Sequence, residues 1–238
     1  MRRVLSLLPL ALALSACASR PILSPGDRAT LVRASARQAR FLRVAMYAGP
    51  FFGDEGRLFL SARPAAELAL SAGPGEKPLP APAFERILAP GTPFFVEELQ
   101  FPTGIGLLVR PSSAPRDRPW VLGRVPGETR GAVLVLSAGA LTADDLVAEM
   151  GRLLTADDPS PALRALPDGQ RAAIGKKEVV EGMARDAVAM AWGYPDRISI
   201  DDVLHTEEWV WSEGQRRAVF QDDRLVHFDS LRPDRSKG

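Results

Sequence analysis

The chain has 238 residues, and its 30 Lys and Arg nearly balance its 29 Asp and Glu, which gives a formal net charge of +1 at pH 7. A near-neutral chain without a local basic stripe has no general attraction for nucleic acid, so we expect no nucleic-acid partner. The single cysteine excludes a disulfide within the chain. No apolar run after the first residues approaches the ~18 residues of a membrane-spanning helix.

Residues 1–16 have the pattern of a secretory signal peptide. Arg2 and Arg3 give a positively charged start, and the apolar run from Val4 to Leu14 is too short to span a bilayer as a helix. Small residues and the single cysteine follow directly, in the order Leu14-Ser15-Ala16-Cys17. Because a signal peptide is removed after export, we expect residues 1–16 to be absent from the folded protein.

The sequence Leu14-Ser15-Ala16-Cys17 resembles the lipobox of bacterial lipoproteins, in which the cysteine receives a diacylglycerol and the signal peptide is cut just before it. The resemblance implies a covalent lipid on Cys17 that anchors the chain to a membrane, and no other cofactor is expected. Ala18-Ser19 places no Asp beside the cysteine, which implies an outer-membrane lipoprotein that faces the periplasm. The alternative is an ordinary signal peptide cut near Ala16 or Ala18, with Cys17 incidental.

The next segment, residues 17–39, is predicted to be the lipidated cysteine followed by a tether. Residues 18–29 are rich in Ser, Pro and Gly and show no periodicity, as is typical of a flexible linker. Residues 31–42 have a weak helical pattern, in which apolar residues are interleaved with arginines.

Residues 40–138 are predicted to form a small all-β domain. Short apolar runs bounded by Gly or Pro clusters are typical of buried strands, and this region has them at Arg57–Leu60, Phe94–Val96, Gly106–Val109 and Ala132–Leu136. Between them, Ser71–Pro82 has too many Pro and Gly for an element and is predicted to be an exposed loop. The regular spacing favours a small barrel, and the segment from Leu88 to Val125 resembles a bacterial SH3-like domain.

Residues 142–230 are predicted to form an α+β domain, followed by a tail over residues 231–238. Thr142 is placed to cap a helix that runs to about Thr155, at the junction between the two domains. A short helix is predicted at Lys177–Val180, and a second helix ends at Trp192. Three strands follow, at Glu207–Trp211, Arg217–Phe220 and Leu225–Phe228, and the last two are joined by a tight turn at Asp222-Asp223.

A spaced motif, Gly-Met-x4-Val-x4-Gly-x-Pro, occurs in this region as Gly182, Met183, Val188, Gly193 and Pro195. With Trp209 and the hairpin that follows, it resembles the SmpA/OmlA (BamE-like) domain. Members of that family are small outer-membrane lipoproteins, and the best known is an accessory of the β-barrel assembly machinery. The resemblance implies a two-layer α-α-β-β-β fold over residues 170–230. Each motif residue can also be explained by the fold alone, as a helix start, a buried contact or a helix end. The chain departs from the family in carrying about 120 residues of extra β-rich sequence before the motif.

No pattern in the chain indicates catalysis. His205 with Glu207 and Glu208 is the nearest approach to a metal cluster, but adjacent carboxylates on a strand point to opposite faces, and zinc needs at least three converging ligands. His227 is predicted to be a packed or edge residue of a strand. The chain has no Gly-x-Ser-x-Gly elbow and no phosphate-binding Gly-rich loop before a helix. We therefore predict a protein that is not an enzyme and holds no metal.

Aromatic residues are the candidates for binding a partner. Trp209 and Trp211 share one face of a predicted strand and form, with Tyr194, a possible recognition patch. Trp120, at the end of a charged loop that contains Arg116, is a second candidate. The alternative for these tryptophans is a place in the core, which is the more common position for large aromatic residues.

We predict a lipid-anchored protein that binds another envelope protein, or assists assembly, at the outer membrane. The alternative is a lipoprotein whose β-rich domain binds either a cell-wall glycan, peptidoglycan, or a small ligand. An exposed aromatic stripe in a groove of the first domain would favour a glycan. An apolar patch on the C-terminal sheet would favour a protein partner.

Overall fold

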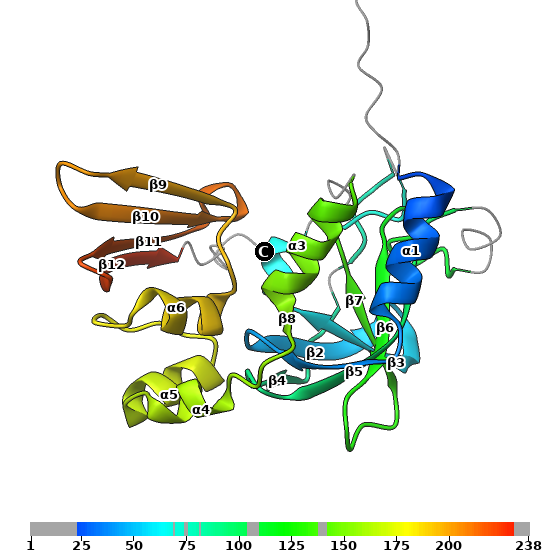
Figure 1. The fold of residues 1–238 in the computed structure, drawn as a ribbon, viewed down its shortest axis with the longest axis horizontal. Helices are drawn as coiled ribbons and strands as arrows, with labels where there is room; N and C mark the ends of the chain where they lie inside the picture. Colours follow the sequence, from blue (N-terminus) through cyan, green and yellow to red (C-terminus); the bar gives the residue numbers. More distant parts are fainter. Residues whose placement is uncertain are drawn as a thin grey trace, which may run out of the picture.

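The computed structural model describes residues 23–68, 70–73, 76–80, 82–103, 110–137 and 142–230. The predicted signal peptide, Cys17, the predicted strand Gly106–Val109 and the predicted tail over residues 231–238 lie outside these ranges. The fold is α+β, as predicted: a mixed eight-stranded sheet with helices stands beside a separate antiparallel four-stranded sheet (Figure 1). No helix within the described ranges is long and apolar enough to cross a membrane.

The first sheet is open and is not a closed barrel. Its strand order is β4-β2-β3-β7-β6-β5-β1-β8, and only β3 and β7 pair in parallel. The strands are β1 (Gln38–Leu42), β2 (Met46–Phe51), β3 (Asp54–Ser61), β4 (Arg86–Leu88), β5 (Pro93–Gln100), β6 (Trp120–Arg124), β7 (Gly131–Val135) and β8 (Leu154–Thr155). The predicted barrel is wrong, because the end strands β4 and β8, of three and two residues, do not pair with each other.

A helix stands at the start of the described chain, inside the segment predicted to be a tether. This helix, α1 (Pro25–Ser35), forms because the Ser24 side chain accepts a hydrogen bond from the backbone N–H of Asp27 and because Pro25 suits a first helical position. It ends before β1, so the helical pattern predicted to reach Leu42 stops at Ser35. Leu31 is buried, and this contact fixes α1 on the sheet.

The helix α3 (Ala143–Leu153) covers the same side of the sheet (Figure 1). It begins at Thr142, as predicted, and Thr142 and Asp145 form a capping box in which each side chain accepts a hydrogen bond from the other residue's backbone N–H. Leu146 packs into the apolar core beneath α1 and α3. The helix that was expected to join two domains therefore contributes to the first core.

The opposite face of the eight-stranded sheet carries an aromatic cluster. Alternation along β3 places Leu58 and Leu60 beneath the helices and Phe59 on the other side, where Phe51 and Trp120 pack with it. Loop residues cover this cluster, and they include a short 3-10 helix, η1 (Ala65–Glu67), near its edge. Both faces of the sheet are therefore covered over their central strands.

The second unit contains three helices and a four-stranded sheet in the order β12-β11-β10-β9. Its elements are α4 (Ser160–Ala165), α5 (Asp168–Gly175), α6 (Arg185–Trp192), β9 (Arg197–Asp201), β10 (Thr206–Trp211), η2 (Ser212–Gly214), β11 (Arg216–Gln221) and β12 (Arg224–Ser230). The three predicted strands and the helix that ends at Trp192 are confirmed. The helix predicted at Lys177–Val180 is wrong, because α5 ends before it, and β9 was not predicted.

The motif residues of the second unit have structural roles. Gly193, at φ +83°, closes α6, and its N–H donates to the carbonyl of Ala189 at 2.8 Å. Gly182, at φ +80°, donates to the carbonyl of Leu225 in β12 at 2.8 Å. Met183, Val188 and Pro195 are buried. The turn predicted at Asp222-Asp223 is confirmed, since both residues have positive φ, of 49° and 64°.

The two units share a buried interface around the backbone of Ala45, in the link between β1 and β2. The Ala45 N–H donates to the carbonyl of Met190 in α6 at 2.7 Å, and its carbonyl accepts from the Lys177 amine at 2.6 Å. Nearby, the carboxylate of Glu67 in η1 pairs with the Arg216 guanidinium in β11 at 2.7 Å. The side chain of each is no more than 7% exposed. These contacts hold the units against each other.

Candidate functional site

The structure places the predicted aromatic residues of the second unit mainly in its core. Trp209 and Trp211 do share one face of β10, but that face is covered by α6, and both side chains are buried. Trp211 packs edge-on against Trp192 with ring centroids 5.3 Å apart, and its indole N–H donates to the carbonyl of Gly193. Their surfaces are therefore not open to a partner.

The other predicted residues lie apart from this pair. Trp120 is buried on the far face of the first sheet, with the Arg110 guanidinium over its ring. Arg116 is half-buried and lies 3.6 Å from the Glu76 carboxylate. Tyr194 is half-buried beside Arg43, in a groove between the two units. The structure thus does not bring these residues together into one recognition patch.

A different surface stands out on the second unit, along β9 at the edge of its sheet. All five residues of β9 are exposed. Ile198 and Ile200 pair with Trp209 and Glu207 of β10, so they lie on the face of the sheet that packs against α6. They extend past the helix, and Ile198 is 50% exposed and Ile200 69% exposed.

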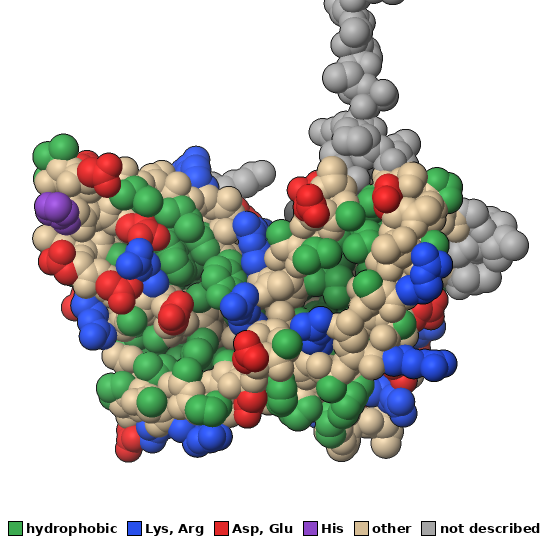
Figure 2. All heavy atoms as spheres, in the orientation of Figure 1, with side chains coloured by type: hydrophobic (Ala, Val, Ile, Leu, Met, Phe, Trp, Pro, Cys, Tyr) green, Lys and Arg blue, Asp and Glu red, His purple; other side chains and the backbone are tan. Residues whose placement is uncertain are grey.

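The turn after β9 continues this apolar surface. Val203 is 86% exposed and Leu204 63% exposed. The Asp201 carboxylate accepts hydrogen bonds from the backbone N–H groups of both residues at 3.0 Å, which holds the turn in one conformation. We call Ile198, Ile200, Val203 and Leu204 the β9 apolar edge. Figure 2 shows hydrophobic side chains at this end of the molecule beside acidic ones.

The two edges of the four-stranded sheet differ in what covers them. At β12, the segment before α6 runs along the outer side of the strand: Gly182 donates to the carbonyl of Leu225, Leu225 donates to the carbonyl of Met183, and Ala184 bridges Arg224. At β9, no described residue pairs with the outer side of the strand. An open edge that also exposes large apolar side chains is a ready template for an added strand.

An acidic rim borders the β9 apolar edge. Ile200 lines a depression of about 250 Å³ together with Asp202, Asp222, Asp223 and Glu207. The Arg185 guanidinium pairs with Asp223 and Glu207, and its hydrogen bond holds the pKa of the Asp223 carboxyl below its ordinary value. Asp202 and Asp222 form no ion pair with any described residue. The rim therefore carries negative charge beyond what Arg185 neutralises.

The outer face of the same sheet is polar instead. Arg217 pairs with Glu208, and His227 lies 3.1 Å from the Asp229 carboxylate. The other histidine, His205, follows the apolar turn at a positive φ of 52°. Within the described ranges, no three His, Cys, Asp or Glu side chains form a group that could hold a metal ion.

Sequence reasoning missed the β9 apolar edge although a signal was present. The alternation of Ile198, Ser199 and Ile200 is a strand pattern, and Val203-Leu204 between Asp202 and His205 is an apolar pair in a polar turn. The exposure of these side chains could not be inferred from the sequence, because apolar residues in a strand are usually buried.

Comparisons with known proteins add no identity to this site: no family model, curated protein or solved structure matches the chain.

Proposed function

We propose that this chain is a lipid-anchored envelope protein that binds an extended segment of another envelope protein along β9. The anchor is the proposed lipid on Cys17, and the resemblance of the second unit to BamE-like lipoproteins supports an accessory role at the outer membrane. The carrying observation is the β9 apolar edge: an edge strand that no described residue pairs on its outer side, and that exposes four large apolar side chains together with the turn after it.

The geometry favours addition of a strand over docking of a flat surface. A partner segment in extended conformation would continue the sheet by main-chain hydrogen bonds, and its alternate side chains would contact Ile198 and Ile200. Asp202 and Asp222 at the rim favour a basic residue next to those apolar side chains. The proposed partner is therefore a protein segment with alternating apolar residues and at least one Lys or Arg.

The glycan alternative receives less support from the described part of the chain. Binding of a sugar by stacking would need exposed aromatic rings in the first unit. Phe51, Phe59 and Trp120 are buried in the cluster on the far face of its sheet. Phe95 in β5 is 45% exposed, but it is a single ring and not an aromatic stripe.

Site-specific crosslinking in the native envelope tests the proposal. A photo-reactive amino acid in place of Ile200, in the full-length protein, should give a discrete adduct, and the same amino acid in place of the exposed Arg217 on the outer face of the sheet should not. Mass spectrometry of the adduct identifies the partner peptide, which should be an apolar and basic segment. Asp202→Lys should weaken the adduct from position 200, because it reverses charge at the rim.

Two outcomes would overturn the proposal. One is equal adducts from positions 200 and 217, and the other is an adduct that Asp202→Lys leaves unchanged. A Cys17→Ala chain reports separately on the anchor: it should lose membrane attachment and, with it, the adduct in the envelope.

A further inference from the structure

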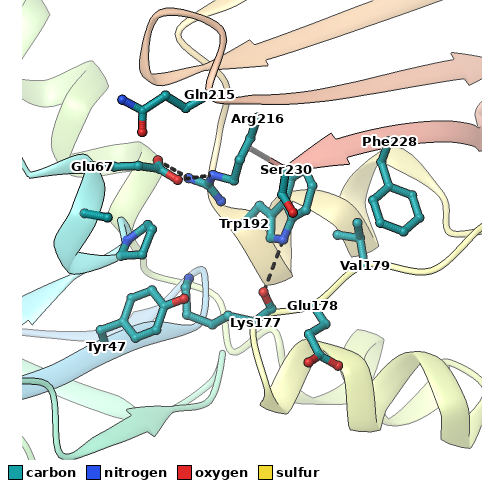
Figure 3. A pocket seen from close by; sticks show the side chains of 12 residues that line it. Tyr47, Glu67, Lys177, Glu178, Val179, Trp192, Gln215, Arg216, Phe228 and Ser230 are labelled. Carbon is teal, nitrogen blue, oxygen red and sulfur yellow. Dashed lines mark hydrogen bonds and ion pairs between the residues drawn. The ribbon is translucent and has the colours of Figure 1, made fainter. Parts of the chain in front are cut away.

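A cavity of about 450 Å³ lies between the two units, away from β9. Figure 3 shows its two walls: Tyr47 and Glu67 come from the first unit, and Lys177, Trp192 and Arg216 face them from the second. Pro64, Val179 and Phe228 complete the apolar lining. This volume is within the range of small-molecule sites, which are typically apolar with a few polar groups that converge on the ligand.

Lys177 is an unusual residue at the wall of this cavity. It is only 5% exposed, and its amine donates to the carbonyls of Ala45 and Ala191, at 2.6 and 2.8 Å. A charged lysine has three donors, so one remains when these two carbonyls are satisfied. No carboxylate of the described chain lies within ion-pair distance of it. Lysine is rarely buried without a counter-charge.

The acidic group whose charge acts on Lys177, Glu67, is already paired with Arg216. Both carboxylate oxygens of Glu67 face Arg216: Oε1 lies 2.7 Å from Nε as an ion-pair contact, and Oε2 accepts a hydrogen bond from Nη2 at 2.8 Å. Oε2 also accepts from the Ser212 hydroxyl. Glu67 and Arg216 therefore form a closed, neutral pair. Glu178, which also lines the cavity, is exposed. An anion from outside the chain would supply the missing charge for Lys177.

Tyr47 adds a second group that is open to a ligand. The Lys177 amine lies 5.0 Å from the centre of the Tyr47 ring, and no described residue forms a hydrogen bond with the Tyr47 hydroxyl. A carboxylate has several acceptor sites and can accept from an ammonium and a hydroxyl together. Beyond this polar corner, Trp192, Val179 and Phe228 offer an apolar surface for the rest of the ligand.

We propose that the cavity between the two units binds a small organic carboxylate, with its carboxylate on Lys177 and Tyr47 and its apolar body against Trp192 and Phe228. The ligand would act as the counter-ion that the fold itself does not provide. The site is independent of the β9 apolar edge, so either proposal can fail alone.

Burial of Lys177 predicts a change of protonation on binding. Desolvation, together with the charge of Arg216, holds the pKa of the Lys177 amine well below its ordinary value, and the charge of Glu67 opposes that shift. A bound carboxylate would favour the charged amine, so binding should be accompanied by proton uptake when the empty site holds the neutral form.

Calorimetry on the full-length protein in lipid nanodiscs tests the proposal with a matched pair of probes. 4-Phenylbutyrate carries a carboxylate and an apolar body, and 4-phenylbutyramide replaces only the charge. The carboxylate should bind with one-to-one stoichiometry and at least about tenfold more tightly than the amide, as expected for a charge-assisted hydrogen bond. Inorganic phosphate should compete weakly, because it has charge without an apolar body.

Variants localise the binding. Lys177→Met should abolish the preference for the carboxylate, while Lys176→Met, at the exposed neighbouring lysine, should leave it unchanged. If Lys177→Met does not fold, Tyr47→Phe decides, because it removes one hydroxyl and should weaken the carboxylate about threefold or more. Absence of saturable binding, equal binding of acid and amide, or a preference that survives both variants would overturn the proposal.

Discussion

The two sheets of this protein are completed in different ways. The eight-stranded sheet is covered by α1 and α3 on one face and by loops over an aromatic cluster on the other. Among the described residues, α6 covers one face of the four-stranded sheet, and its two edges differ: Gly182–Ala184 cover β12, whereas no described segment covers β9. The packed face under α6 stabilises the second sheet, whereas its open edge strand β9 is the surface to which we assign binding in the proposal above.

The largest expected effect is on the face of that sheet that α6 covers. Trp211→Ala removes a fully buried indole that packs on Trp192, and it should lower the free energy of unfolding by about 3–5 kcal/mol. Urea unfolding followed by circular dichroism measures it. Val203→Ala, at the open end, is the control and should change stability by less than about 0.5 kcal/mol. Similar losses in both variants would contradict the comparison.

A second test concerns the contact between the units. Glu67→Gln leaves the Arg216 guanidinium buried without its counter-charge, and it should cost about 3 kcal/mol of unfolding free energy. Arg217→Gln, which breaks an exposed pair on the outer face, should cost less than about 1 kcal/mol. Thermal unfolding of both variants side by side separates them. Equal shifts of the unfolding midpoint in the two variants would mean that the Glu67–Arg216 pair contributes no more to stability than the exposed pair.

The pH dependence of stability tests the environment of Lys177 at the interface between the units. Burial lowers the pKa of Lys177 in the folded state below the 10.5 of the unfolded chain, so the unfolded state binds more protons between the two values. Stability should therefore rise with pH toward 10.5, by at most about 1.4 kcal/mol per pH unit from this one group.

Lys177→Met should remove that rise, and Lys176→Met should keep it. Tyr47 acts in the opposite sense at higher pH, because burial raises its pKa from 10.0 and folding then opposes its ionisation. Glu67 and Arg216 also face Lys177 across the cavity. Urea midpoints at about pH 8 and about pH 9.5 make the measurement. A slope that persists in Lys177→Met would assign it to another group.

The helix over the first sheet should show a smaller effect. Thr142→Ala removes the side chain that caps α3 and should lower the unfolding free energy by about 1 kcal/mol. Thr142→Ser keeps the hydroxyl and should retain most of the stability. Chemical denaturation of the pair checks the cap, and an equal loss in both variants would count against it.

The smallest effect on stability should accompany a clear effect on binding. Ile200→Lys replaces an exposed side chain, so the unfolding free energy should change by less than about 0.5 kcal/mol. Crosslinking from a photo-reactive amino acid in place of Ile198 should nevertheless weaken in Ile200→Lys. Val147→Lys, at an apolar site on α3 that is 58% exposed against 69% for Ile200, is the matched control and should leave the adduct intact.

Local patterns predicted much of the second unit. Trp209 and Trp211 alternate on β10, Gly193 closes α6, and Asp222-Asp223 turn the hairpin, because each feature depends on a few neighbouring residues. The first sheet was predicted less well. Its open order depends on the parallel pairing of β3 with β7, between residues more than 70 positions apart, which periodicity does not report.

The candidate sites show the same limit. The apolar residues of β9 could be read from the sequence. That no element of the described residues covers them depends on the arrangement of the whole sheet, which local patterns do not report. Lys177 and Tyr47 face one cavity only because the segment that follows α5 and strand β2 meet at the interface between the units. The predicted tryptophans were ambiguous from the start, since buried and exposed aromatic residues have the same local pattern.

The position of Ala45 has a consequence for the integrity of the chain. Its backbone belongs to the first unit, yet both its polar groups bond to the second, through Met190 and Lys177, and its side chain is fully buried there. A cut between Asp157 and Ser160, in the connection that leads to α4, would sever the chain without releasing either half. The two fragments should remain together as a nicked complex, and neither should fold well when expressed alone.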